Sequence, residues 1–401
     1  MSSKLIGGIL LVMGTTIGAG MLALPIATAE LGFWGSTLLL IVCWAIMTTC
    51  AFLFLEVNLW LPPNNNMVSM VGATLGRSGQ VVAWVLYLML LYSIISAYIA
   101  GGGDLFHYIL NNSNIPISLP LSKILFTGLF GFIVYLGIRA VDYFNRGLMS
   151  GKMGALLLLI FLIVPYISQG NLHTGSWAYL ASPASISTTV VAFASLMIIP
   201  SLRTYFGEDI KSLKKAILIG TFIPLVCYIL WDMVIMGVIP LEGTPGLRAL
   251  AHSSSSNSGL VAALTVILNK EIITIIAKFF TSICMATSFL SVSLSLSDVL
   301  SDGLQVAKRG MGNVIVFGAT FVPPVLVVLF YPDAFLRGIQ YAGLCCFVLM
   351  ILFPPLMVWR GRYHHELALE APHQVRGGKF LLGLLVVFAT LMIGFGLEGA
   401  I

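Results

Sequence analysis

Charged residues are scarce in this chain of 401 residues. Asp, Glu, Lys and Arg together make up 9% of it, whereas a soluble globular domain carries about 25%. Hydrophobic residues make up 59%, and the mean hydropathy is +1.02. This composition excludes a soluble globular protein and predicts a protein that crosses a membrane several times.

Cysteine is also scarce, and its positions exclude two classes of site. All six cysteines lie in apolar runs rather than in loops: Cys43, Cys50, Cys227, Cys284, Cys345 and Cys346. This placement excludes a disulfide framework and any metal cluster with a recognisable ligand spacing. We therefore expect no metal and no cofactor, and we expect the cysteines to pack as small hydrophobic residues.

Two further motifs are missing. The first apolar run begins at Leu5 and lacks the small-residue cleavage site of a secretory signal peptide. No Walker motif occurs in the sequence, which excludes ATP-driven transport by this chain alone.

Eleven apolar runs are long enough to be transmembrane helices, since about 20 residues are needed to cross roughly 30 Å of hydrocarbon. They lie at about 5–30, 33–58, 80–110, 121–139, 150–168, 188–206, 213–238, 271–297, 312–331, 338–358 and 379–398. The sequence therefore predicts an all-α membrane protein that forms a single transmembrane domain over residues 1–401.

Lys and Arg are unevenly distributed between the two sides of these spans. If the N-terminus is cytoplasmic, fifteen of the 20 Lys and Arg residues lie on the inner side, and the outer side holds only Lys123, Arg248, Lys270, Lys278 and Arg337. The positive-inside rule thus predicts a cytoplasmic N-terminus. An odd number of spans then places the C-terminus outside. The net charge of +5 is explained by these loops and requires no nucleic-acid partner.

The first predicted span contains the stretch GTTIGAGMLALP, which is rich in residues that disfavour a helix. Glycine costs about 1 kcal/mol relative to alanine in a helix, and unpaired backbone groups are tolerated in a membrane only where they line a protected cavity. We therefore expect a broken helix. Its outer half would offer to an anion the N–H groups of Gly18, Ala19 and Gly20, and its inner half would offer to a cation the carbonyls near Thr15 and Thr16. Such a pair of sites fits the zwitterion of an α-amino acid.

Helix packing is the second interpretation of the same glycines. Gly14 and Gly18 form a GxxxG pair, through which membrane helices approach each other closely. However, Gly20 and Pro25 make the stretch richer in helix breakers than packing requires. A matching interruption five spans later would favour the broken helix.

The sixth span carries such an interruption. It runs apolar to Ile199, and Pro200 and Ser201 are then expected to break it. Two interrupted spans in corresponding positions are typical of transporters built from inverted repeats. On this basis residues 1–170 and 185–358 would be the two repeats, and 379–398 would be an additional helix.

Four stretches resemble the hydroxy- and aromatic amino-acid permeases, the bacterial tyrosine and tryptophan permeases of the amino acid–polyamine–cation superfamily. They are GGILLVMGTTIGAGMLALPIATAELGFWGS, LEVNLWLPPNNN, AYIAGGGDL and IPSLRTYFGEDIKSLKKAILIGTFIPLVCYILWDMVIMGVIP. The resemblance covers most of the chain. It implies a LeuT-like fold of two inverted five-helix repeats with broken helices 1 and 6, plus one extra helix. It also implies proton-coupled uptake across the bacterial inner membrane, with the C-terminus periplasmic.

The sequence departs from that family in span six. The family tends to carry glycines and a histidine between the phenylalanine and Ile-Pro-Ser. Here the segment reads Phe193, Ala194, Ser195, Leu196 and Met197, with Leu196 at the histidine position. In this fold the segment lines the side-chain pocket, and its apolar members suit tyrosine, tryptophan, phenylalanine or a large aliphatic residue. In span three, Tyr92 and Ser96 share a helix face and are candidates for substrate contact, with ordinary packing as the alternative.

Charged residues inside spans are the candidates for ion coupling, because burying a charge in a membrane is costly. Glu56, Asp232 and Lys152 are such residues. The resemblance favours Lys152, since some proton-coupled relatives place a lysine on span five where sodium lies in sodium-coupled relatives; an interfacial lysine is the alternative. Its ammonium would bond span-one carbonyls and the hydroxyls of Ser288 and Ser291. The same hydroxyls, with carbonyls near Gly14 and Ile17, would instead suit sodium.

Alternatives from other classes are weaker. Gly76 to Gly79 matches the GxSG of rhomboid proteases, but it falls in an inner loop, and all six histidines lie in or beside loops. Gly101 to Asp104 matches the GxGD of aspartyl proteases, but no second aspartate motif accompanies it. A passive channel would need a ring of like residues. We therefore expect an alternating-access carrier, not an enzyme, whose partners are an amino acid, a proton or sodium, and the lipid bilayer, with no nucleic acid and no obligatory protein partner.

Overall fold

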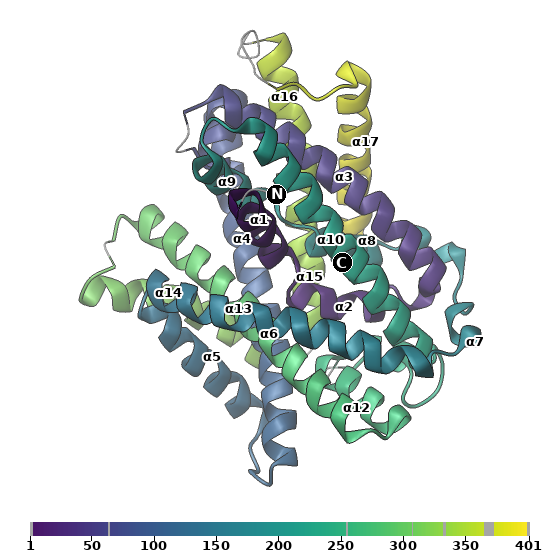
Figure 1. Cartoon of the computed structure of the whole chain (residues 1–401). Coiled ribbons are helices and arrows are strands. Elements are labelled where there is room, and N and C mark those ends of the chain that lie inside the picture. The colour runs from purple at the N-terminus through teal and green to yellow at the C-terminus, as the bar shows by residue number, and fades with distance from the viewer. Residues whose placement is uncertain are drawn as a thin grey trace.

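The computed structural model describes residues 3–62, 65–253, 256–306, 308–331, 334–364 and 373–398, and within them the chain forms helices and no strands (Figure 1). The first half of the chain consists of α1 (Ser3–Thr16), α2 (Ala19–Ala27), η1 (Ala29–Leu31), α3 (Gly32–Trp60), α4 (Met67–Asn112), α5 (Leu119–Tyr135), α6 (Ile138–Ile163) and η2 (Val164–Tyr166). Two short elements, α7 (Gln169–Leu172) and η3 (Trp177–Ala181), lead into the second half.

The second half begins with a segmented helix made of α8 (Pro183–Ala192), η4 (Leu196–Ile198) and α9 (Ile199–Phe206). It continues with α10 (Ile210–Val238), α11 (Leu247–Ala251), α12 (Ser256–Leu268), α13 (Glu271–Leu304) and α14 (Met311–Phe330). A third segmented helix follows, made of α15 (Ala334–Cys346), the π-helical η5 (Phe347–Leu352) and α16 (Phe353–Tyr363), and α17 (Gly378–Glu398) is last.

Nine helices of the described ranges are long and apolar enough to cross a membrane, or ten if α1 and α2 form one span. Ten of the eleven predicted runs thus have a counterpart. The remaining run, predicted at 121–139, is the 17-residue helix α5. Gly137 adopts φ 96°, a conformation open to glycine, and α6 begins at the next residue. The predicted fourth span therefore ends early and the fifth begins about twelve residues sooner than expected.

The helix α4 also differs from its prediction at 80–110. It extends over 46 residues because a kinked inner segment precedes the span, and the kink lies at Gly76 with φ 85°. Asn66 and Ser69 form a capping box that begins this segment. The chain between spans two and three is thus helical rather than a simple loop.

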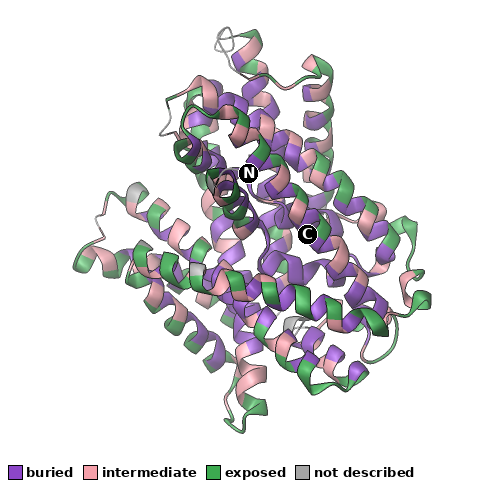
Figure 2. Ribbon diagram, viewed as in Figure 1, coloured by how far each residue is buried: buried purple, intermediate pink, exposed green. Residues whose placement is uncertain are grey.

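The core lies where the segmented helices meet. The helix α1 packs on α10, α2 packs on α8, α10 and α13, and α15 packs on α4 and α8. Figure 2 shows buried residues concentrated in this centre and exposed residues on the outer helices. The outer faces carry large apolar side chains, such as Phe161 on α6 and Phe380 on α17, which are 74% and 81% exposed. Such faces fit contact with lipid rather than with water.

Candidate functional site

The first span is interrupted, as the sequence predicted. Its two halves, α1 and α2, are separated by Ile17 and Gly18 and are bent by 52°. Gly18 is extended (φ −159°, ψ −153°), so any residue could adopt its backbone conformation. The position favours glycine for another reason, because a Cβ atom there would overlap the Ser288 Oγ of α13. Gly18 therefore lies in the break and also lets this part of the chain approach α13 closely.

The second interruption is present but lies earlier than predicted. The helix α8 ends at Ala192, and residues 193–195 separate it from η4 and α9. The prediction of a break at Pro200 and Ser201 is wrong in position, because Pro200 occupies the first turn of α9. A proline is tolerated there, since N–H groups of the first turn have no intrahelical acceptor.

Tyr228 of α10 joins the two interruptions. Its hydroxyl donates toward the carbonyl oxygens of Thr16 (2.7 Å) and Ala192 (2.8 Å), the last residues of α1 and α8. Its ring lies 5.2 Å from that of Phe193. The negative ends of two helix dipoles therefore converge on one hydroxyl, which marks a site suited to a cation. Sequence reasoning missed Tyr228; the available signal was a tyrosine in an apolar span, whose hydroxyl needs a partner when buried.

Lys152 reaches the same break from α6. Its ammonium group donates to the carbonyl oxygen of Ile17 at 2.6 Å, and the residue is only 1% exposed. The predicted contact between Lys152 and a span-one carbonyl is therefore present, and the interfacial alternative does not describe its position. The carbonyl end of α1 offsets part of the cost of burying the charge.

The start of α2 presents amides to the same region. The N–H of Ala19 donates to the Ser288 hydroxyl at 2.9 Å. For the N–H of Gly18 no acceptor is recorded among the described residues, and Gly20 follows in the first turn, where amides lack intrahelical acceptors. An anion placed here would meet several N–H groups and the positive end of the nine-residue helix α2.

Other predicted residues lie at or near the break. The hydroxyls of Thr15 and Thr16 both donate to the Val12 carbonyl of their own helix. The contact of these residues with the site is therefore made by the Thr16 carbonyl, which accepts from Tyr228. Gly14 lies on α1 beside Met149. In span six, Phe193, Ser195 and Leu196 are buried, whereas Ala194 and Met197 are partly exposed. The segment thus has both buried and accessible members.

Several predicted residues have partners outside this region. The Tyr92 hydroxyl donates to the Ala319 carbonyl of α14 (2.7 Å), which agrees with the packing alternative, and Ser96 of the same helix is buried. Ser291 accepts a hydrogen bond from Asn145 of α6 (3.0 Å) on an exposed part of α13. These residues remain unassigned to substrate or ion.

The two acidic candidates lie in different surroundings. The carboxylate of Glu56 accepts hydrogen bonds from Nε and Nη2 of Arg362, at 2.7 and 2.6 Å, and from the N–H of Val375 at 2.8 Å. This bidentate pair ties α3 to α16 and to the chain before α17. Asp232 of α10 is fully buried near the end of α2, where it accepts a hydrogen bond from Ser36 at 2.5 Å.

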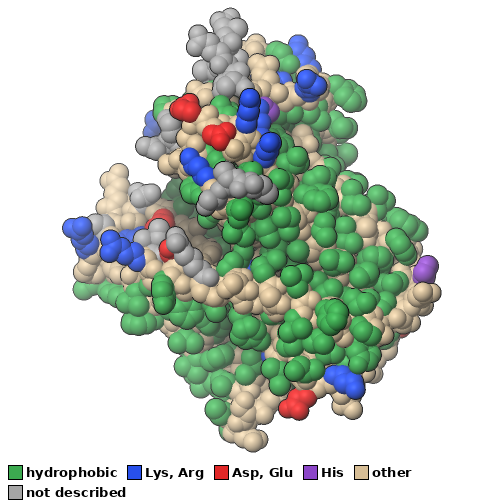
Figure 3. Space-filling view, in the orientation of Figure 1, with side chains coloured by type: hydrophobic (Ala, Val, Ile, Leu, Met, Phe, Trp, Pro, Cys, Tyr) green, Lys and Arg blue, Asp and Glu red, His purple; other side chains and the backbone are tan. Residues whose placement is uncertain are grey.

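A cavity of about 700 Å³ opens beside η4 and α9, the elements that follow the second interruption. Its walls come from α3, α4, α9, α13 and the chain before α4, and they include Phe54, Gln80, Trp84, Met197, Ser201, Ser295 and Asp298. We call this cavity the vestibule. Ser295 is two turns from Ser288 on the same helix, so the vestibule leads toward the break. Figure 3 shows a hollow between the helices around the N-terminus and the hairpin that joins α13 to α14.

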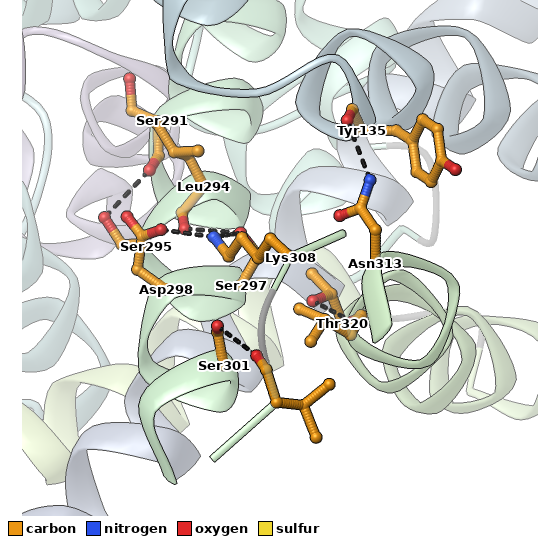
Figure 4. A network of polar contacts seen from close by, with 12 residues as sticks. Tyr135, Ser291, Leu294, Ser295, Ser297, Asp298, Ser301, Lys308, Asn313 and Thr320 are labelled. Carbon is orange, nitrogen blue, oxygen red and sulfur yellow. Dashed lines mark hydrogen bonds and ion pairs between the residues drawn. The ribbon is translucent and has the colours of Figure 1, made fainter. Parts of the chain in front are cut away.

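Two polar side chains of α13, Ser295 and Asp298, line the vestibule, and Figure 4 shows the network of polar contacts around them. Lys308, from the chain after α13, forms an ion pair with Asp298 and donates to the Ser297 hydroxyl at 2.7 Å. Ser295 donates to the Ser291 carbonyl, one turn further along α13. Ser295 and Asp298 are thus the polar α13 side chains on the vestibule wall.

The opposite side of the molecule is sealed. Arg248 of α11 holds Glu30 of η1 through two hydrogen bonds, at 2.5 and 2.7 Å, and also pairs with Glu242. The hydrogen bonds with Glu30 raise the pKa of Arg248. Asp104 of α4 accepts the N–H of Ser258 at the start of α12 (2.9 Å). We call this the sealed side, because these contacts join α11 to η1 and α4 to α12 among the described residues, whereas the vestibule opens on the α9 side.

Comparison with known proteins places the chain among membrane transport proteins. The model of the tryptophan/tyrosine permease family matches residues 1–395. Tyrosine-specific transport system 2 of Haemophilus influenzae is 32% identical, with 98% of this chain and 97% of the relative covered. The tryptophan-specific transport protein of the same organism is 31% identical, with 98% and 95% covered. Glutamine transporter 2 of Aliivibrio fischeri is 30% identical, with 98% and 99% covered.

Proposed function

The chain belongs to the tryptophan/tyrosine permease family, and on this premise we propose that it imports an aromatic amino acid together with a proton across the bacterial inner membrane by alternating access. One observation carries the proposal: Lys152 donates to the carbonyl of Ile17 at the break, next to the amides that begin α2. A group that binds a proton therefore directly contacts the backbone that would bind the substrate.

Family membership also decides between classes of protein. The family and the curated relatives are permeases and transporters, so the intramembrane protease alternative is removed. With its apolar helices, the chain is a multi-pass membrane protein. The eleven-span arrangement, with α5 as the short fourth span and inverted repeats at 1–170 and 185–358, remains part of our proposal, as does α17 as the additional helix.

The substrate would bind with both of its charges at the breaks. Its carboxylate would lie on the amides of Gly18 to Gly20, where Ala19 must exchange its bond to Ser288 for the substrate or share it. Its ammonium would replace the Tyr228 hydroxyl between the carbonyls of Thr16 and Ala192. Its side chain would lie against Phe193 and Met197, which suits tyrosine, tryptophan or phenylalanine.

Lys152 would couple this site to the proton. As an ammonium it binds the carbonyl end of α1 and stabilises the bent arrangement. When the proton leaves, the charge that holds α1 is lost, and α1 is free to move relative to α6. Because Nζ already occupies the Ile17 carbonyl, that oxygen is not free to ligate sodium in this arrangement, which favours a proton. Glu56 is left out of the coupling route because Arg362 and Val375 already satisfy its carboxylate.

The vestibule would be the cytoplasmic exit. It is lined by span ends that the positive-inside rule places in the cytoplasm, and its volume of about 700 Å³ falls within the roughly 300–1,000 Å³ of small-molecule sites. In this interpretation the N-terminus is cytoplasmic and the C-terminus is periplasmic. The sealed α12 side then faces the periplasm, and the structure represents the inward-open state.

Uptake into proteoliposomes tests the proposed function. An acidic exterior should drive accumulation of labelled tyrosine, tryptophan or phenylalanine above the external concentration, and collapse of the pH gradient should abolish it. Leucine and glutamine belong in the same panel, because one relative is named a glutamine transporter. Accumulation that requires sodium and ignores the pH gradient would contradict proton coupling. Equilibration without accumulation would contradict symport altogether.

Thiol labelling tests the orientation and the vestibule. All six native cysteines are buried, so their background reaction should be low. Ser201→Cys and Ser295→Cys, both on the vestibule wall, should react with a membrane-impermeant thiol reagent only from the cytoplasmic side, and substrate should slow the reaction. Asn112→Cys, at the exposed end of α4 on the sealed side, should react only from the periplasmic side. Reversed sidedness would refute the proposed topology.

A further inference from the structure

The carboxyl group of Asp232 is isolated in the core between α2, α3 and α10. The residue is 0% exposed. Its Oδ2 lies 2.5 Å from the Ser36 hydroxyl of α3, and its Oδ1 has no hydrogen-bond partner in the part of the chain that the structure describes. The Ser36 hydroxyl is therefore the one hydrogen-bond partner of this carboxyl group among the described residues.

The charged side chains that the structure describes on the surrounding elements have other partners or face outward. The helix α10 packs against α1, α2, α3, α6, α7, α9 and η2, and neither α2 nor α7 carries a titratable residue. Three basic residues donate to backbone carbonyls: Lys4 to that of Phe206, Lys152 to that of Ile17 and Arg203 to that of Leu61. Glu56 forms an ion pair with Arg362. Arg139 and Asp142 are exposed. On α10 itself, Tyr228 donates to two carbonyls, and Lys211, Lys214 and Lys215 lie at the far end. None of these described groups forms a hydrogen bond or an ion pair with Asp232.

A buried carboxylate without a cation or a full set of donors is strongly disfavoured. The neutral acid fits the same site well, because it can donate its own hydrogen. Asp232 would then donate to Ser36, Ser36 to Thr28, and Thr28 to the carbonyl of Leu24. The three contacts measure 2.5, 2.9 and 2.8 Å. In this arrangement each hydroxyl donates one hydrogen bond, and the last bond of the series is accepted by the backbone of α2.

We propose that Asp232 is a proton-binding site distinct from Lys152, and that its protonation from the periplasmic side permits α2 to close against α3 and α10. The proposal rests on the proposed function, because it assumes an outer closed state. An ionised Asp232 would need water, which only an opened outer side can supply. The bound proton stays with the carrier, since the site is sealed from the vestibule. Asp232 thus controls the closing step, while Lys152 carries the coupled proton.

Exchange across proteoliposomes at varied external pH tests this role. With substrate on both sides, wild-type exchange should fall as external pH rises into the alkaline range, approaching about ten-fold per pH unit for a single required proton. Asp232→Asn, which mimics the neutral acid, should keep exchanging and lose this dependence. Glu271→Gln, at an exposed carboxylate at the start of α13, should retain the wild-type profile.

The outcomes separate this proposal from the proposed function. At an acidic exterior, Asp232→Asn should still accumulate substrate as the wild type does. If the wild type itself does not accumulate substrate, the proposed function fails. If Asp232→Asn keeps the wild-type dependence of exchange on external pH, the role of Asp232 fails. Should the variant not fold, infrared spectroscopy of the wild type near pH 7 decides: absence of a carbonyl band from a buried neutral carboxylic acid would overturn the proposal.

Discussion

Lys152→Ala should abolish accumulation of substrate driven by a pH gradient, while exchange of substrate between the two sides continues. One pH unit is worth about 1.4 kcal/mol per proton, which sustains an accumulation of about ten-fold for one coupled proton. Without the ammonium group, the Ile17 carbonyl loses its contact and the carrier has no proton to release, so the ratio of internal to external substrate should fall to one. Radiolabelled uptake with the membrane potential clamped measures this ratio.

Lys123 offers a matched control for this variant. It is also a buried lysine that donates to a backbone carbonyl, that of Val328 at 3.2 Å, but it lies on α5, away from the break. Lys123→Ala should therefore show the cost in stability of losing a buried lysine while it keeps pH-driven accumulation. Lys152→Ala with an undiminished accumulation ratio would remove this residue from the coupling mechanism.

Gly18→Ala should weaken substrate binding by about ten-fold or more, which corresponds to at least about 1.4 kcal/mol. The added methyl group would overlap the Ser288 hydroxyl, so either this hydroxyl rotates away and leaves the N–H of Ala19, or the start of α2 moves away from α13. In either case the amides that we assign to the carboxylate would lose their present arrangement with Ser288. The shift of the unfolding temperature with substrate concentration measures the affinity in the purified protein.

Two further variants identify the cause of this loss. Gly154→Ala adds a methyl group to a helical glycine of α6 with open space around it, and it should bind substrate normally. The double variant Gly18→Ala, Ser288→Ala removes the overlapping oxygen, whereas the Ser288 Cβ lies at an acceptable 3.6 Å. It should recover much of the affinity that Gly18→Ala loses. Normal binding by Gly18→Ala alone would show that the geometry of this break does not hold the substrate.

The break positions show where sequence reasoning was strong and where it was weak. The first interruption was predicted to within a residue or two, because three glycines in seven residues are a local signal. The second was misplaced by several residues, because a proline was taken as the point of rupture. At the start of α9 the same proline is a favourable residue, and the actual break at 193–195 contains no glycine or proline to mark it.

Individual site residues could be proposed from their type but not from their partners. Lys152 and Asp232 stood out as charges in apolar runs. Their surroundings differ, since Lys152 contacts a carbonyl 135 residues away and Asp232 contacts only a hydroxyl. Glu56 was a candidate on the same ground, but Arg362, 306 residues away in the chain, holds its carboxylate. Tyr228 was missed because a single tyrosine carries no periodic or compositional signal.

The sequence alone determined that this protein crosses a membrane and that its first span is broken. Both conclusions depend on composition and on local backbone chemistry, which are properties of neighbouring residues. Tertiary structure alone decided that Tyr228 joins the two breaks, that Lys152 contacts Ile17, that Oδ1 of Asp232 has no partner among the described residues, and that the vestibule lies between α4, α9 and α13. The physical reason is that a buried polar group must find its partner in space. In this fold those partners come from helices that are distant in the chain.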